Sequence, residues 1–167
     1  MRNIFYYLTV SILFLSCKKE SNSRVDIYAL KTFELNVNQT ATPATLVITN
    51  AVPEDKPIVS DNDIEYYTKS TSEFKLNKDI SSITKTYGRD KAFVVTVNKQ
   101  PVYYGVFHPA YLSSMSLGVA TIDPILFYGK NLKVQFIKIE GNSLLQKLDK
   151  RNDSRITNSL KSTGRLR

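Results

Sequence analysis

Hydrophobic and polar residues alternate along several short stretches of the chain, and a period of two predicts β-strands. Such stretches occupy residues 26–37, 44–49, 72–76, 119–122 and 132–139. The densest pattern lies at 93–97 and 102–107, where two runs of β-branched and aromatic residues are separated by turn-forming residues at 98–101. We therefore expect a hairpin here, and its nearly continuous hydrophobicity favours the centre of a sheet.

A helical period of hydrophobic residues is found in two places. The segment 77–88 carries Ile80, Ile83 and Tyr87 at i, i+3 and i+7, between an N-cap residue and a terminating glycine. A looser helical stripe runs through residues 142–167, which are rich in Lys and Arg. We expect a short packed helix in the first segment and a basic C-terminal helix or tail, frayed or disordered, in the second.

Together these elements predict an α+β domain over residues 26–141. The expected architecture is a single, mostly antiparallel sheet of about five to six strands, with the short helix against the central hairpin. Three further segments complete the predicted organisation, namely a leader at 1–17, a polar tether at 18–25 and the basic segment at 142–167.

The first seventeen residues have the layout of a secretory leader. Arg2 precedes a mainly apolar run at 4–15, and polar residues follow from Ser16. The run has twelve residues, whereas a helix that crosses the hydrocarbon core needs about 20. This run therefore predicts an export signal and not a membrane-spanning helix.

Residues Phe14, Leu15, Ser16 and Cys17 resemble the lipobox of a bacterial lipoprotein signal. The resemblance implies a diacylglycerol group on the Cys17 thiol, cleavage after Ser16 and acylation of the new amino terminus. Residues 18–20, Lys-Lys-Glu, partly match a mark of surface-displayed lipoproteins in the Bacteroidota phylum. The expected location is the bacterial cell envelope, anchored to the inner or outer membrane and either periplasm-facing or surface-exposed.

Charge and cysteine content further limit the possible partners and the way the domain is stabilised. The net charge is +8, but residues 144–167 hold seven Lys or Arg against two Asp, a local charge of +5. The charge pattern thus argues against nucleic acid as a partner and favours contact of the basic tail with anionic lipid. Cys17 is the only cysteine, so once it is lipidated the 150 residues after it must fold without a disulfide.

Few residues are candidates for metal binding or catalysis. Asp61, Asp63 and Glu65 would share a face if extended and could hold a hard cation, but Ser60 before them favours a capped turn. His108 is the only histidine, which excludes a histidine pair for zinc, and its position at a strand end favours a structural role. We expect no bound metal and no cofactor.

Three tyrosines and His108 are candidates for ligand binding. Tyr103, Tyr104 and Tyr111 lie near His108 and could stack on sugars or peptides, although a buried hairpin would use the same side chains as core. The sequence lacks a phosphate-binding loop, a nucleophile elbow and a His-Glu zinc motif. We therefore expect no enzymatic activity. A carboxylate-based envelope hydrolase is the weaker alternative, and it would use Asp61, Asp63, Glu65 and Asp123.

The order of elements in residues 60–123 resembles the first periplasmic head domain of the SecD/SecDF export subunit. The resemblance is carried by Asp63-Ile64, Phe74-Lys75-Leu76, the following helix, the run at 92–97 and Pro101-Val102-Tyr103-Tyr104. It implies a non-catalytic fold that binds polypeptide. The expected function is a membrane-anchored binding or accessory module, with an inhibitor or immunity-type lipoprotein that blocks one partner as the alternative.

Overall fold

The computed structural model describes residues 23–88, 90–125 and 129–167, and the predicted leader lies outside this range. Most strands belong to a five-stranded sheet of order β2-β1-β5-β6-β7, called here the large sheet. All its pairs are antiparallel except β6 with β7. Its strands are β1 (Val25–Asn38), β2 (Thr45–Pro53), β5 (Ala92–Val97), β6 (Gln100–Phe107) and β7 (Ala120–Ile122).

A second sheet corrects the prediction of a single one. The small sheet has the order β3-β4-β8, with β3 at Ile64–Thr68, β4 at Glu73–Leu76 and β8 at Asn131–Lys133. Beyond the end of β8, Gln135 forms an isolated antiparallel bridge with Thr121 of β7. Period-two patterning predicts strands but not their partners, because a strand buries its apolar face equally well in either sheet.

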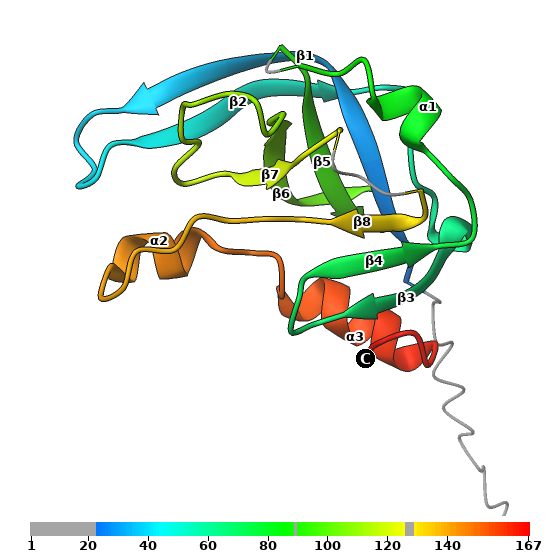
Figure 1. Cartoon of the computed structure of the whole chain (residues 1–167). Helices are drawn as coiled ribbons and strands as arrows, with labels where there is room; N and C mark the ends of the chain where they lie inside the picture. The colour runs from blue at the N-terminus through cyan, green and yellow to red at the C-terminus, as the bar shows by residue number, and fades with distance from the viewer. Residues whose placement is uncertain (1–22, 89, 126–128) are drawn as a thin grey trace, which may run out of the picture.

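The main core lies between the two sheets (Figure 1). The large sheet contributes inward residues such as Ile27, Val95 and Phe107, and the small sheet contributes Phe74 and Leu132, all at most 1% exposed. A second, smaller cluster covers the other face of the large sheet and includes Leu30, Ile48, Val94 and Val106. The large sheet is thus buried on both faces near its centre, which explains the continuous hydrophobicity of β5.

The central hairpin is confirmed. Strands β5 and β6 occupy the third and fourth positions of the large sheet. Asn98 and Lys99 connect them with φ values of 52° and 64°, the left-handed conformation that two-residue hairpin turns require. Gly105 lies under the ring of Phe93, and a side chain at this position would overlap that ring.

The predicted helix at 77–88 is wrong in length and in its buried face. Helix α1 spans only Ser81–Thr84, and the Asp79 carboxylate accepts the Ser81 amide hydrogen bond at 2.7 Å. Ile80 is fully buried, but Ile83 is 45% exposed. The chain leaves the helix after one turn, and the Tyr87 ring beyond it packs edge-on against Phe107 at 4.8 Å between ring centroids.

The predicted long strand at 132–139 is also shorter than expected. Strand β8 ends at Lys133, after which Val134 donates to the Ser72 carbonyl and Gln135 bridges to Thr121. The segment 142–167 contains helices α2 (Ser143–Leu148) and α3 (Ser154–Ser162). Ile156 and Leu160 of α3 are fully buried in the main core.

The C-terminal residues after α3 lie along β3. The Tyr67 amide donates to the Arg165 carbonyl, and the Arg167 amide donates to the Tyr67 carbonyl, both at 2.8 Å. The Arg167 guanidinium stacks on the Tyr66 ring at 3.8 Å from its centroid. The segment predicted as a frayed or disordered tail therefore has a packed helix and an ordered end, because its apolar stripe completes the core.

Candidate functional site

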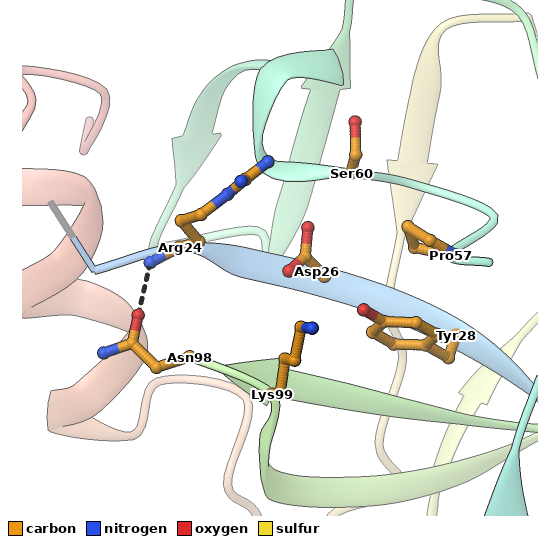
Figure 2. A pocket seen from close by; sticks show the side chains of 7 residues that line it. All are labelled: Arg24, Asp26, Tyr28, Pro57, Ser60, Asn98 and Lys99. Carbon is orange, nitrogen blue, oxygen red and sulfur yellow. Dashed lines mark hydrogen bonds between the residues drawn. The ribbon is translucent and has the colours of Figure 1, made fainter. Parts of the chain in front are cut away.

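A groove on the outer face of β1 is the best candidate for a binding site. It has a volume of about 330 Å³ and lies where the start of β1, the β5–β6 turn and the segment before β3 meet (Figure 2). An adjoining hollow of about 210 Å³ shares Tyr28 and Lys99 with it. We call the first of these the β1 groove, and its lining residues are Arg24, Asp26, Tyr28, Pro57, Ser60, Asn98 and Lys99.

Strand alternation explains why polar side chains gather there. Ile27 points into the main core, so its neighbours Asp26 and Tyr28 point to the opposite face of the sheet. Asp26 pairs with Thr96 of β5, and the Thr96 hydroxyl donates to the Asp26 carbonyl at 3.2 Å. The Arg24 amide donates to the Asn98 side-chain oxygen at 2.9 Å, which joins the start of the strand to the turn.

The Asp26 side chain is held in place at the edge of the groove. The residue is only 6% exposed, and its Oδ1 accepts the Asp61 amide at 2.9 Å. Figure 2 shows the carboxylate directed toward the groove, with Arg24 and Lys99 on either side. A buried carboxylate needs hydrogen-bond donors, so an oxygen that faces the groove favours a ligand that can donate.

An ion pair behind the groove stabilises this arrangement. Asp61 accepts the Val25 amide at 2.9 Å and two bonds from the Arg165 Nη2 atom at 2.8 and 2.9 Å. The Arg165 Nη1 atom also donates to the carbonyls of Asp61 and Ile64. The C-terminal residues thus fix the first residues of β1, which line the groove.

The groove is lined by both charged and neutral polar side chains. Burial raises the pKa of Tyr28, the Asp26 carboxylate raises it further, and Arg24 partly offsets both. Tyr28 is therefore a neutral phenol at physiological pH. Within residues 23–88, 90–125 and 129–167, neither Arg24 nor Lys99 has a carboxylate within ion-pair distance, so both cations can meet a ligand.

The structure places the four predicted ligand-binding residues elsewhere. Tyr103 and Tyr104 line a different hollow, of about 210 Å³, between β2, β6 and Leu148. Tyr111 is 71% exposed on the loop after β6. His108 contacts the buried Ser116 hydroxyl through its Nδ1 atom at 3.1 Å.

The contacts of Tyr103 and His108 indicate that both side chains have a structural role. The Tyr103 side chain belongs to the main core, and its hydroxyl has no hydrogen-bond partner among the described residues. Burial, with a smaller contribution from Tyr67, raises its pKa well above the ordinary value. The contact of His108 with Ser116 connects the strand end to the following loop, and Ser116 is only 1% exposed.

Asp61 and Asp63 form a capped turn, as predicted, while Glu65 lies in strand β3. A 3₁₀ turn spans Asp61–Asp63, and the Asp63 carboxylate accepts hydrogen bonds from the amide and hydroxyl of Ser60 at 2.7 and 2.6 Å. Burial alone would raise the pKa of Asp63, but hydrogen bonds from Lys78 and Ser60 outweigh it and hold the pKa below its ordinary value. Within the part of the chain that the structure describes, no three metal-binding side chains converge.

The sequence did not point to Arg24, Asp26, Tyr28 and Lys99 as site residues. The first three follow one another at a spacing of two at the start of a predicted strand, which places them on one face. That spacing was a usable sign, but the approach of Lys99 and the segment 57–60 depends on how the strands pair. Tertiary contacts alone create the groove.

Comparisons with known proteins identified no related protein. No protein-family model matches the chain, and neither the curated proteins nor the solved structures contain a match to it. In the described ranges, no helix has the length and hydrophobicity needed to cross a bilayer. Cys17 and the predicted leader lie outside those ranges.

Proposed function

We propose that this protein is a membrane-anchored lipoprotein of the bacterial cell envelope, and that it acts as a non-catalytic binding module through the β1 groove. The observation that carries the binding role is the groove itself, where a nearly buried carboxylate, an aromatic ring and two cations without acidic partners in the described residues converge. A concave site with a few fixed polar groups is the usual form of a ligand site.

The anchor is supported by the sequence. Phe14, Leu15, Ser16 and Cys17 match a lipobox, and the β1 groove begins at Arg24, seven residues after the predicted lipid attachment at Cys17. Whether the domain faces the periplasm or the exterior stays a prediction from residues 18–20. The polypeptide ligand implied by the resemblance to the SecD/SecDF head domain also stays a prediction.

The contribution of the basic C-terminal segment to membrane binding is smaller than its charge implies. Four of its seven cations contact protein groups, since Arg151 pairs with Asp149, Arg155 with Asp153 and Arg165 with Asp61, while Arg167 stacks on Tyr66. Anionic lipid therefore has Lys147, Lys150 and Lys161 as its main contacts in this segment.

A hydrolase that uses Asp61 and Asp63 has little support. Asp61 is paired with Arg165, and Asp63 is bonded to Ser60 and Lys78. A catalytic carboxylate must contact its substrate, whereas these two are engaged with the protein. The inhibitor or immunity role remains the second candidate, because a protein partner could also use the groove.

Membrane fractionation tests the anchor. Cys17→Ala should block lipid attachment and remove the mature protein from the membrane fraction, with the unprocessed form followed separately by its mass. The mature form staying in the membrane after the substitution would contradict the proposed anchor.

A crosslinking pull-down from native membranes tests the binding role. Lys99→Glu reverses a charge in the groove, and we expect it to remove the captured partner or ligand. Lys133→Glu reverses the charge of an exposed lysine on β8 and serves as the matched control. Capture of one stoichiometric protein that is lost with Lys99→Glu would favour the inhibitor role. Capture that Lys99→Glu leaves unchanged would contradict binding in the β1 groove.

A further inference from the structure

The β1 groove presents both signs of charge within one small site. Asp26 lies between Arg24 and Lys99, and the ring of Tyr28 continues the row along β1 (Figure 2). A ligand with only negative charge would meet the Asp26 carboxylate, and a ligand with only positive charge would meet the two cations. The site is therefore complementary to a zwitterion.

Each charged group fits one half of such a ligand. Asp26 can accept hydrogen bonds from an ammonium, and the neutral Tyr28 ring favours a cation over its face. The Arg24 guanidinium matches the geometry of phosphate oxygens, and Lys99 adds a second positive charge. The Asn98 oxygen is already bonded to the Arg24 amide, which leaves its amide NH₂ group as a further donor.

The chain length between the predicted anchor and the groove limits where the groove can lie. Arg24 follows Cys17 by seven residues, and a fully extended chain of seven residues spans at most about 25 Å. A chain anchored by lipid at Cys17 therefore keeps the groove close to the membrane surface. Phospholipid headgroups are the zwitterions concentrated at that surface.

We propose that the β1 groove binds a phospholipid headgroup that carries a primary ammonium and a phosphate, as in phosphatidylethanolamine. This inference rests on the proposed anchoring function and names its ligand. Asp26 and Tyr28 contact the ammonium, and Arg24 and Lys99 contact the phosphate. The headgroup contact orients the domain on the bilayer in addition to the lipid chain at Cys17.

The structure also indicates which headgroups bind less well. A quaternary ammonium has no N–H group to donate to the Asp26 carboxylate, so a choline headgroup loses that hydrogen bond. A glycerol headgroup has no positive charge and leaves Asp26 unpaired next to the phosphate. Ethanolamine is therefore favoured over both choline and glycerol.

Isothermal titration calorimetry with a soluble headgroup tests the chemistry directly. The lipidated protein in detergent micelles is titrated with glycerophosphoethanolamine, glycerophosphocholine and glycerophosphoglycerol. We expect the first to bind at least about tenfold more tightly than the other two, because a charged hydrogen bond is lost in each. Equal affinity for the three probes, or no binding of any, would overturn the inference.

Two variants locate the binding. Asp26→Asn keeps an oxygen for the Asp61 amide and so preserves the fold, while Lys99→Gln changes an exposed turn residue. Each should weaken glycerophosphoethanolamine binding about tenfold, and Lys133→Gln on β8 should leave it unchanged. Unaltered binding in both groove variants would place the headgroup elsewhere and refute the proposal.

A lipid experiment separates a headgroup from a free zwitterion. In nanodiscs of phosphatidylethanolamine, the amide resonances of Asn98 and Lys99 should shift from their positions in phosphatidylcholine nanodiscs. A response to the soluble probe without this shift would refute the lipid as the ligand. Failure of Cys17→Ala to release the mature protein would refute the anchor, whereas a null titration with an intact anchor would refute only the headgroup.

Discussion

Within the described chain, residues 25–30 of β1 lie between two neighbouring segments, whereas residues 31–38 lie beside one. The first half pairs with β5, and on its other edge Ile27 exchanges hydrogen bonds with Val59 at 2.8 and 3.1 Å. The second half pairs with β2 alone within the described chain. Accordingly Val25 and Ile27 are fully buried, while Leu35 is 36% and Val37 52% exposed.

The two halves of β1 thus differ in role, since the first half belongs to the buried core and carries the groove, whereas the second half is largely exposed. Both halves have alternating apolar residues, so their local patterns predict the same burial. The first half is instead enclosed by segments distant in the chain, since Val59 bonds to Ile27 and Arg165 holds the Asp61 carboxylate that accepts the Val25 amide. Rigid backbone contacts of this kind are what a binding groove needs, and the groove lies on this half.

The largest effect should come from the ion pair behind the first half of β1. Arg165→Met leaves the nearly buried Asp61 carboxylate without its cation, and we expect a loss of about 3 kcal/mol in unfolding free energy. Urea unfolding measures this loss. The matched control is Arg155→Met, since Arg155 pairs similarly with Asp153 but is half-exposed, and it should cost under about 1 kcal/mol. Equal costs for the two variants would mean that Arg165 does not stabilise the groove.

The same substitution at both ends of β1 tests the comparison itself. Val25→Ala removes two methyl groups from a fully buried site and should cost about 2 kcal/mol, whereas Val37→Ala at an exposed site should cost under about 0.5 kcal/mol. Thermal unfolding of the two variants gives both values. Similar losses would show that the second half of β1 is covered in solution.

The substitution Tyr103→Phe tests whether the inward-facing side chains in register with the first half of β1 belong to the core. Ile27, Val95 and Tyr103 lie in register across β1, β5 and β6, and the Tyr103 hydroxyl is buried without a partner in the described residues. Its removal should raise the unfolding free energy by about 1 kcal/mol and leave binding in the β1 groove unchanged. A fall in stability would show that the hydroxyl does have a partner.

The smallest expected effect is the loss of the Asp63 contribution to stability at acidic pH. Asp63 has a pKa below its ordinary value in the fold, so its contribution to stability is present above the unfolded pKa of about 3.9 and is lost as the pH falls through the folded value. Asp63→Asn should therefore lower the melting temperature slightly at pH 7 and make no difference near pH 2. Melting curves from pH 7 to pH 2 check this, and a difference that persists at pH 2 would assign the effect to packing.

Local patterns were sufficient where an element depends on its own residues. The hairpin of β5 and β6 follows from two dense β-forming runs and a turn, and the capped turn at Asp61–Asp63 follows from Ser60 and the acid three residues later. They failed for α1, because Ile83 has helical spacing but is 45% exposed. They also failed for the number of sheets, because strand partners are chosen over long distances.

The sequence by itself determined the strands β1, β5 and β6 and the capped turn, because each depends on residues close together in the chain. The anchor at Cys17 stays a prediction from the sequence. Only the tertiary structure decided that Tyr103 is core, that Arg165 pairs with Asp61, and that Lys99 reaches Asp26 and Tyr28 from a different hairpin. The physical reason is that burial and charge pairing depend on neighbours in space, which a linear pattern does not specify.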